Sequence, residues 1–309
     1  MSDEAIMSRF LARPGFLLAR IDQICTAIYG SLDGGETLAQ AELLMLLGVL
    51  GPSPQIKLAR CAGVDKSTTA YIIENLNARG WVERGPCRED RRRALVSLTP
   101  TGQSQIARIE RQFADLQRQL ARPLDADALP RAVTLLHKLG SNPMSPAPLW
   151  VPACHPAVGI LDTSLSFLCR RALQLFQAQF VACTPGLNLT LRQFSLLYIV
   201  SAREAITQAA FARLFGLDPS TCAVIIRGLV SRGLIAGTRS AQDKRERIYA
   251  ITDQGRSILL KAQPLVDRSE RLIFRGEPAA RTRWLVRQLQ AIVRDHSHRL
   301  RFPGVMAAP

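Results

Sequence analysis

One phrase occurs twice in this chain, as GVDKSTTAYIIENLNARG at residues 63–80 and as GLDPSTCAVIIRGLVSRG at residues 216–233. Sliding the chain on itself by about 153 positions aligns residues 37–102 with residues 190–255 without a gap, and about 22 of those 66 positions are identical. Self-similarity at one fixed offset is the signature of an internal duplication. Because a period of roughly 150 residues is the size of an ordinary domain, the sequence predicts two related domains in tandem.

The two repeats are expected to occupy residues 1–140 and 157–309. Between them, SNPMSPAPLWVPACHP at residues 141–156 is rich in proline and is predicted to be a semi-rigid linker that could span roughly 50 Å at ~3.1 Å per residue. That length permits the repeats to pair within one chain without requiring it. With 47% hydrophobic residues among its 309, the chain can bury two modest cores.

The charge of the chain points to a polyanionic partner. It has 40 Lys and Arg against 25 Asp and Glu, a formal net charge of +15, so double-stranded DNA is the expected partner. An anionic membrane is disfavoured, because the arginines are scattered over many predicted helices and do not form one basic amphipathic segment. No apolar run approaches the ~18 residues of a spanning helix, and the first residues lack a secretory signal pattern. We therefore expect a cytoplasmic protein.

The repeated phrase has the pattern of a helix-turn-helix. In the first copy an apolar helical run at residues 39–50 precedes a short helix that ends at Gly63, a residue that suits a tight bend. Asp65 is a candidate N-cap for the next helix, and Gly80 ends it. On a helical wheel the inward residues of that helix are Thr69, Ile72, Ile73 and Leu76. Long flanking helices are predicted at residues 14–31, 101–121, 125–139, 157–183, 254–275 and 278–299.

Each copy continues into a predicted two-stranded wing with a cationic tip. Strand-prone runs at residues 81–85 and 94–99 flank PCREDRRR, and runs at residues 234–238 and 247–252 flank RSAQDKRE. A surface helix and a solvated turn would explain either feature alone, but both features recur at the same register. A helix in the major groove beside a wing on phosphates or the minor groove fits the pattern. The candidate DNA-binding residues are Lys66, Ser67, Thr68, Tyr71, Asn75, Arg88, Arg91, Arg92, Ser220, Thr221, Val224, Arg227, Arg239, Lys244 and Arg245.

This order of elements, with DRRRALVSLTPTG at residues 90–102 and DKRERIYAITDQG at residues 243–255, resembles the MarR family of winged-helix regulators. The shared wing signature is D-x-R, then an L-T or I-T pair, then x-x-G. The resemblance implies a mainly α fold with small β wings, in which two winged helix-turn-helix lobes stand on a shared helical bundle of the dimerisation type. It also implies a ligand-responsive transcription factor that is normally a homodimer.

The duplication departs from that family pattern. What the family builds from two subunits can here be built from one, so a monomeric pseudo-dimer is expected, with a homodimer as the alternative. The expected function is sequence-specific DNA binding that represses transcription, modulated by a small effector held between the bundle and a lobe. The segment RPGFLLARIDQI resembles first helices of members that answer to aromatic acids, which favours an aromatic effector.

Two other functions stay open. An architectural DNA-binding protein would need no effector. A protein-interaction module that has lost DNA binding is disfavoured, because Arg92 and Arg245 are present in the wings. The sequence contains no phosphate-binding loop, HExxH or G-x-S-x-G motif, so no enzyme activity, cofactor or metal is expected.

The cysteines give a third alternative. Seven cysteines without a CxxC spacing argue against a disulfide framework and favour reduced thiols. Cys25 and Tyr29 lie one helical turn apart, and QICTAIY resembles the first-helix segment of the family's organic hydroperoxide sensors. Packing explains Cys25 better, because no basic side chain is visibly placed to lower its pKa.

The outward faces of the two candidate recognition helices differ. Ser67, Tyr71, Glu74 and Asn75 in the first copy correspond to Ser220, Val224, Arg227 and Gly228 in the second. These side chains offer different donors and apolar contacts to base edges. The sequence therefore predicts an operator whose two half-sites differ.

Overall fold

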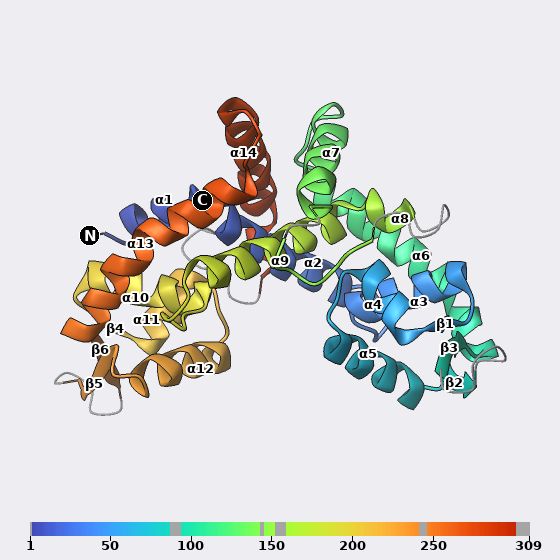
Figure 1. Ribbon diagram of the computed structural model, residues 1–309, viewed down its shortest axis with the longest axis horizontal. Coiled ribbons are helices and arrows are strands. Elements are labelled where there is room, and N and C mark those ends of the chain that lie inside the picture. The colour runs from blue at the N-terminus through green and yellow to red at the C-terminus, as the bar shows by residue number, and fades with distance from the viewer. Residues whose placement is uncertain (1, 87–93, 143–144, 152–158, 241–245, 301–309) are drawn as a thin grey trace. The chain divides into compact units, whose positions relative to one another are not determined.

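The computed structural model describes residues 2–86, 94–142, 145–151, 159–240 and 246–300 (Figure 1). The chain divides into two compact units, each built around one copy of the repeat. The first-repeat unit is Ile21–Gln174, and the second-repeat unit joins Met1–Arg20 to Leu175–Pro309.

In the first-repeat unit, three helices and a small sheet make the winged helix-turn-helix, and longer helices flank it. The winged helix comprises α3 (Leu38–Leu50), β1 (Ser53–Pro54), α4 (Gln55–Ala62), α5 (Lys66–Ala78), β2 (Val82–Pro86) and β3 (Ala94–Leu98). The flanking helices are α6 (Pro100–Ala121), α7 (Ala128–Gly140) and the short α8 (Gly159–Asp162).

The second-repeat unit has the same order of elements. It comprises α10 (Leu191–Arg203), β4 (Ala205–Thr207), α11 (Gln208–Phe215), α12 (Pro219–Val230), β5 (Ile235–Arg239), β6 (Arg247–Ile251), α13 (Asp253–Ile273), α14 (Ala279–His296) and the 3-10 helix η2 (Ser297–Arg299). The chain begins with α1 (Asp3–Leu11), a helix that the sequence analysis did not anticipate, which also belongs to this unit. The prediction of a mainly α fold with small β wings is confirmed.

Two helices belong partly to each unit. The boundaries at residues 20/21 and 174/175 fall inside α2 (Pro14–Gly30) and α9 (Leu165–Cys183). Each unit therefore contains the winged helix of one repeat and the N-terminal flank of the other. The division of the sequence at the proline-rich segment remains a prediction about the repeats.

Polar contacts tie the N-terminal segment to the second-repeat unit. The Arg13 guanidinium pairs with Asp267 at 2.6 Å and with Glu270 at 2.9 Å on α13. The Gln290 amide on α14 donates to the Leu11 carbonyl at 2.9 Å. The side chains of Ile6, Met7 and Phe10 on α1 are part of the buried hydrophobic cluster of this unit. The polar contacts of Arg13 and Gln290 join segments more than 250 positions apart in the sequence, which local periodicity does not reveal.

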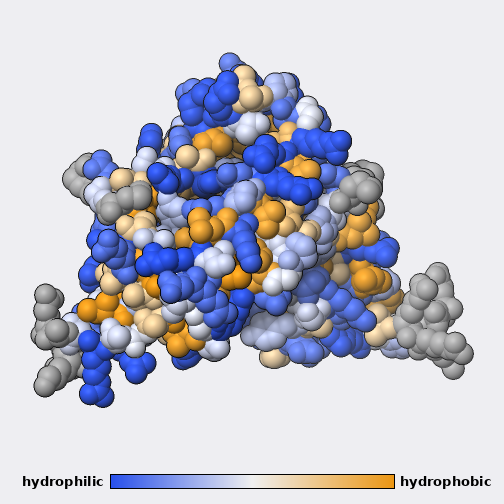
Figure 2. Space-filling view, turned by 60° about the vertical axis from the view of Figure 1, so that its left-hand side comes forward, coloured by the Kyte–Doolittle hydropathy of each residue, from blue (hydrophilic) through white to orange (hydrophobic). Residues whose placement is uncertain are grey.

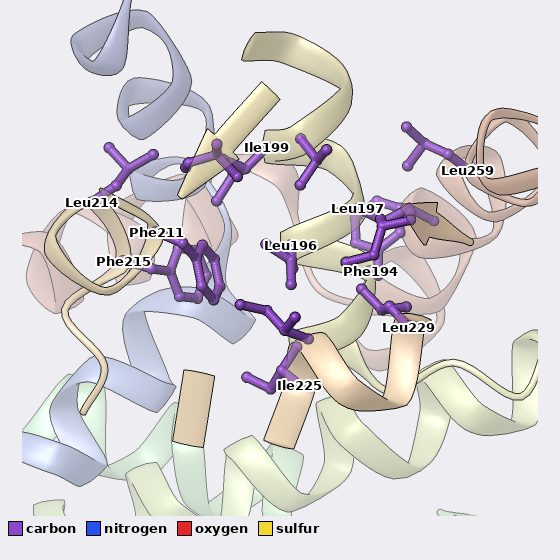
Figure 3. Close-up of a cluster of buried hydrophobic side chains, with 14 of the residues drawn as sticks. Phe194, Leu196, Leu197, Ile199, Phe211, Leu214, Phe215, Ile225, Leu229 and Leu259 are labelled. Carbon is purple, nitrogen blue, oxygen red and sulfur yellow. The ribbon is translucent and has the colours of Figure 1, made fainter. Parts of the chain in front are cut away.

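The core of the second-repeat unit holds its helix-turn-helix together. Figure 3 shows Phe211 and Phe215 of α11 beside Leu196 of α10, with Ile225 and Leu229 of α12 turned toward the same cluster. The two phenylalanine rings stack with centroids 5.6 Å apart. Burial of these side chains stabilises the angle between the two helices of the motif.

Each wing has three strands and not the predicted two. The orders are β1-β3-β2 and β4-β6-β5, with antiparallel pairing throughout. The third strand comes from the residues just before α4 and α11, which are extended and pair Ser53 with Val96 and Ile206 with Tyr249. This pairing fixes each wing to the start of its helix-turn-helix.

The single helix predicted at residues 157–183 is interrupted. Within its described part, α8 ends at Asp162 and α9 begins at Leu165. Ser164 causes a new start, because its Oγ accepts a hydrogen bond from the Phe167 amide at 3.3 Å as a helix N-cap does.

The surface of the molecule is mainly polar in one view. Figure 2 shows hydrophilic residues over much of this face, with separate hydrophobic patches between them. Among the described residues, no single helix is long and apolar enough to cross a membrane, and α11 with α12 meets that test only as a pair bent by 118°.

Candidate nucleic-acid interface

An aspartate caps each candidate recognition helix. The Asp65 carboxylate accepts hydrogen bonds from the Thr68 amide at 2.9 Å and from the Ser67 and Thr68 hydroxyls at 2.5 and 2.7 Å. These bonds, from Ser67 first, lower the pKa of Asp65 to about 2. Asp218, the N-cap of α12, accepts the matching bonds from the first turn of that helix, and they lower its pKa as well.

The caps define what the first turns can offer to DNA. The predicted contacts Ser67, Thr68, Ser220 and Thr221 all donate their hydroxyl protons to a cap carboxylate. Their oxygens are left as acceptors, and the helix N-terminus already holds an anion of its own. These four hydroxyl groups are therefore not free to donate to DNA, and the exposed side chains elsewhere on the two helices are the better candidates.

The outward faces carry different chemistry at matching positions. The Tyr71 side chain on α5 is 66% exposed, and Val224, at the matching position of α12, is 60% exposed. One turn further, exposed Glu74 corresponds to exposed Arg227, so the charge is reversed. The predicted inward residues of α5 are buried, as the wheel required. The side chains that differ between α5 and α12 at these positions are therefore exposed to solvent.

The Asn75 side chain is partly engaged. Its Nδ2 donates to the Tyr71 carbonyl at 2.9 Å, one turn back along α5. At the matching position α12 has Gly228, where a Cβ would lie 2.9 Å from Nε2 of Gln193. Lys66 is exposed at the start of α5. On α5, the side chains of Lys66 and Tyr71 are therefore more available for contacts with DNA than the side chain of Asn75.

In each repeat, one glutamine links the two helices of the helix-turn-helix. The Gln55 Nε2 on α4 donates to the Lys66 carbonyl at 3.0 Å, and the Gln208 Nε2 on α11 donates to the Pro219 carbonyl at 3.0 Å. These glutamines occupy the same position in the two repeats. Each bond holds the first turn of a recognition helix against the helix that precedes it.

The threonine and glycine of the wing signature lock the wing to the recognition helix. The Thr99 Oγ1 donates to the Gly80 carbonyl at 2.6 Å and accepts from the Gly102 amide at 3.0 Å, which caps α6. A Cβ at Gly102 would lie 1.9 Å from the Trp81 carbonyl oxygen. Only glycine allows this approach of helix to strand.

The second copy repeats this lock. Thr252 donates to the Gly233 carbonyl at 2.7 Å and accepts from the Gly255 amide at 3.0 Å, and a Cβ at Gly255 would lie 2.0 Å from the Leu234 carbonyl oxygen. The signature is therefore a structural requirement of the wing in both repeats.

The described part of the second wing places two arginines side by side. Arg239 on β5 is directly opposite Arg247 on β6, and both are exposed. Like charges at a cross-strand pair destabilise a hairpin. An anion beside this wing would relieve that repulsion. In the first wing the matching pair is Pro86 and Ala94, and Arg84 on β2 is exposed.

Five of the predicted wing contacts lie outside the described residues. They are Arg88, Arg91, Arg92, Lys244 and Arg245. They remain predictions from the sequence.

Comparison with known proteins identifies the family. Residues 37–94 and 189–246 each match the MarR family, one segment in each unit. The multiple antibiotic resistance protein MarR of Salmonella typhimurium is 30% identical over 104 residues, which cover 33% of this chain and 72% of that relative. The chain belongs to the MarR family. It is a winged helix-turn-helix transcriptional regulator with two MarR repeats.

The chain is also similar to two proteins that are described as transcriptional repressors. The HTH-type transcriptional repressor NicR of Pseudomonas putida is 38% identical over 90 residues, 28% of this chain and 57% of that relative. Among solved structures, the transcriptional repressor CouR bound to a 23-mer DNA duplex is 30% identical, with a TM-score of 0.41 over 43% of this chain and 95% of that one.

Sequence reasoning missed several residues that hold this MarR interface together. Gln55, Gln208 and the wing residue Arg247 were not among the predicted contacts. Two further arginines, Arg79 and Arg232, donate to carbonyl groups of the loops before α3 and α10 and so brace the ends of the recognition helices. A comparison of the two repeats at the offset of 153 residues could have found them. Gln55 matches Gln208, and Arg79 matches Arg232, so each pair is identical in the two repeats.

The structure bears on the peroxide-sensing alternative. Cys25 is 2% exposed, and burial raises the pKa of its thiol well above the ordinary value. The Tyr29 hydroxyl donates to Glu36 Oε1 at 2.9 Å. A thiol held protonated reacts slowly with oxidants. These contacts favour packing, and the redox interpretation remains a prediction to be tested.

Among the described residues, the expectation of reduced cysteines is wrong for Cys61. Cys61, buried in α4, is disulfide-bonded, whereas Cys25, Cys169, Cys183 and Cys222 are free. Counting and spacing of cysteines could not reveal this bond, because a disulfide requires proximity in space and not a sequence motif.

Proposed function

We propose that one chain of this MarR-family regulator binds an asymmetric DNA operator as a pseudo-dimer and represses transcription until a small effector releases it. The observation that carries the proposal is the pair of identically braced recognition helices whose exposed faces differ. The caps, glutamine braces and wing locks are the same in both repeats, whereas Tyr71 and Glu74 are replaced by Val224 and Arg227. Two recognition helices that are held in the same way but expose different side chains fit an operator whose two half-sites differ in sequence.

The chemistry of the faces suggests what each would read. The Arg227 guanidinium can make a bidentate contact to O6 and N7 of a guanine in the major groove. Val224 beside it can contact only an apolar group such as a thymine methyl. On α5, Tyr71 offers a hydroxyl, and Glu74 can accept a hydrogen bond from cytosine N4. The α12 half-site should therefore contain a guanine that the α5 half-site does not require.

The single-chain assembly is supported by the exchange of N-terminal flanks. In the second-repeat unit, Arg9 of the first repeat donates to the Tyr198 hydroxyl at 2.6 Å. In the first-repeat unit, the Gln117 Nε2 donates to Ser166 of the second repeat at 2.7 Å. A homodimer would make such exchanges between two chains. Here both exchanged segments belong to one chain, which supports the single-chain assembly.

Repression has the support of the description of NicR as a transcriptional repressor, and it rests on family resemblance. The proposed effector region in the second-repeat unit is the aromatic cluster against α11. Phe10 and Phe16 lie 5.1 and 5.0 Å from the Phe215 ring, centroid to centroid, and the buried Arg20 donates to the Gly216 carbonyl at 3.0 Å. A small aromatic molecule that enters this cluster would press on the turn before α12.

Footprinting of two variants tests the asymmetric operator. Arg227→Ala should relax base preference at one half-site by about 1–3 kcal/mol, and Tyr71→Ala should affect only the other half-site. Arg275→Ala, which removes an exposed charge from the turn after α13, is the matched control. The mass of the protein–DNA complex should correspond to one chain per operator. A palindromic site on which each variant weakens both halves equally would contradict the single-chain assembly.

The same preparations test the alternatives. The affinity of the wild type should fall linearly as log K against log salt, as expected for phosphate contacts. Release by a small aromatic acid would distinguish an effector-controlled regulator from an architectural protein. DNA binding that no small organic acid alters would favour the architectural alternative.

A further inference from the structure

The second-repeat unit has a cavity of about 710 Å³ between three of its segments. These are the end of α13, the part of α14 from Ala279 to Gln290, and the turn that joins α1 to α2, which contributes Ala12 and Pro14 (Figure 1). Its described lining includes no residue of a helix-turn-helix or of a wing. A volume of this size is typical of a site for a small organic molecule.

Two polar links hold the walls of this cavity together. The Arg13 guanidinium, just after α1, binds the Asp267 and Glu270 carboxylates of α13 at 2.6 and 2.9 Å. In addition, the Gln290 Nε2 of α14 donates to the Leu11 carbonyl at 2.9 Å. The turn after α1 is therefore fixed to both helices, and the cavity is preformed.

Part of the lining is apolar. The Phe274 side chain, at the end of α13, is 9% exposed, and its ring centroid lies 5.8 Å from that of Phe176. Val286 on α14 and the turn residues Ala12 and Pro14 add further apolar groups to the lining. An apolar wall in contact with water is stabilised when an apolar group covers it. The cavity therefore favours a ligand that carries an apolar group.

The arginines of the lining have no partners among the described residues. Arg271 on α13 and Arg283 and Arg287 on α14 are exposed, and none of them makes a salt bridge or a hydrogen bond with any described residue. Arg283 and Arg287 lie four positions apart, where like charges destabilise a helix. No acidic residue stands three or four positions from either of them along α14. A bound anion would relieve this repulsion.

The carboxylates of the lining are already paired with arginines that do not line the cavity. Asp267 and Glu270 share Arg13, and Glu277 pairs with Arg281 at 3.1 Å. With the three unpaired arginines, five arginines stand against three carboxylates, an excess of two positive charges. The ligand should therefore be an anion.

We propose that this cavity binds a phosphate monoester that carries an apolar group. The phosphate lies among Arg271, Arg283 and Arg287, and the apolar group lies against Phe274 and Val286. A phosphate monoester suits three arginines better than a carboxylate does, because it carries a charge of about −1.5 to −2 and three acceptor oxygens. Arginine also matches phosphate in geometry, because its N–H groups donate in pairs. The recognition helices take no part in this site, so the proposal does not depend on the proposed function.

The first repeat lacks the matching residues. At the offset of 153 residues, Phe274 corresponds to Ala121, so the apolar wall is missing. In place of the salt bridge from Arg13 to α13, the first-repeat unit has a neutral hydrogen bond from Gln117 to Ser166 at 2.7 Å. We therefore expect one such site in each chain.

Isothermal titration calorimetry of the full chain with n-octyl phosphate tests the proposal. The wild type should bind one molecule per chain, below the concentration at which this probe forms micelles. n-Octanol lacks the phosphate and inorganic phosphate lacks the apolar group, so each should bind about tenfold more weakly or worse. The proposal is overturned if n-octyl phosphate does not bind, if two molecules bind per chain, or if inorganic phosphate binds as tightly.

Two variants of α14 show where the probe binds. The double variant Arg283→Gln/Arg287→Gln removes two of the phosphate contacts and should weaken binding of n-octyl phosphate about tenfold or more. Arg294→Gln removes an exposed arginine of the same helix that does not line the cavity, so this matched control should keep the Kd of the wild type. Equal weakening by both variants would mean diffuse attraction by charge and would overturn the site.

A third variant keeps the test decisive if the double variant does not fold. Val286→Ala shortens an apolar side chain of the lining. It should weaken binding of n-octyl phosphate about threefold or more and leave the binding of inorganic phosphate unchanged. Unchanged binding of n-octyl phosphate would overturn the placement of its apolar group.

A phosphate monoester can be a soluble metabolite or the head group of a membrane lipid. Sedimentation with phosphatidylcholine vesicles that contain phosphatidic acid distinguishes these sources. Vesicle binding that the double variant weakens more than Arg294→Gln does would support the site and identify a lipid. If n-octyl phosphate binds but both variants bind the vesicles equally, the result supports the site and identifies a soluble ester. If neither n-octyl phosphate nor the vesicles distinguish the double variant from Arg294→Gln, the site does not exist.

Discussion

The opposed arginines of the second wing make one substitution informative about both stability and DNA binding. Arg239 and Arg247 face each other across β5 and β6 without an intervening residue. Such a pair costs roughly 0.2–1 kcal/mol, and solvent screening places an exposed pair near the lower end. Arg247→Gln keeps a polar, unbranched side chain, although a shorter one, and removes the repulsion. The free energy of unfolding of the free protein should therefore rise by roughly a few tenths of a kcal/mol.

The same substitution should weaken DNA binding. Each phosphate contact on B-DNA contributes about 0.9 to the slope of log K against log salt, so losing one contact lowers the slope by that amount and weakens binding about eightfold at 0.1 M salt. Urea denaturation measures the first effect, and fluorescence anisotropy with labelled operator DNA at four salt concentrations measures the second. Arg275→Gln should change neither quantity.

Opposite signs in the two assays are the distinctive result. A residue with a purely structural role would lose stability and DNA affinity together. The reasoning predicts that the two arginines repel each other in the free protein and bind a DNA phosphate in the complex. It is wrong if Arg247→Gln lowers the free energy of unfolding, or if the slope of log K against log salt does not change.

The remaining predictions concern the cap, the wing lock and the thiol. Because the folded pKa of Asp65 is depressed to about 2, its cap stabilises the protein above the ordinary carboxyl pKa of about 3.9 and is lost as the pH falls toward 2. Asp65→Asn should therefore show a smaller drop in melting temperature between pH 4 and pH 2, and an equal drop would contradict this. Gly102→Ala should destabilise the protein by about 1–3 kcal/mol or more, because its Cβ meets the Trp81 carbonyl, whereas Gly48→Ala on α3 has space at 3.5 Å and should stabilise it by about 0.5–1 kcal/mol. Urea denaturation separates the two. Cys25→Ser should respond to organic hydroperoxides as the wild type does in a DNA-binding assay, since burial keeps the thiol protonated; an oxidant response confined to the wild type would restore the peroxide-sensing interpretation.

The sequence alone determined the features that depend on short-range pattern. The duplication follows from identity at a fixed offset, and the inward face of α5 follows from the spacing of Thr69, Ile72, Ile73 and Leu76, all of which are buried. The cap at Asp65 follows from residue type at a helix start. The helix face and the cap depend on neighbours within about four positions, so the local pattern contains the information. The duplication needs only a comparison of the chain with itself.

Only the tertiary structure decided which distant segments meet. Trp150 was part of a proline-rich spacer in the sequence, yet it packs on Gly63, nearly ninety positions earlier. The helix α1 belongs with the second repeat because Phe10 packs on Phe215, a contact between residues more than 200 positions apart. The third strand of each wing is likewise set by pairing across the chain, as between Ser53 and Val96. Burial and pairing of this kind stabilise through three-dimensional proximity, and the local pattern of a segment does not specify which partner will cover it.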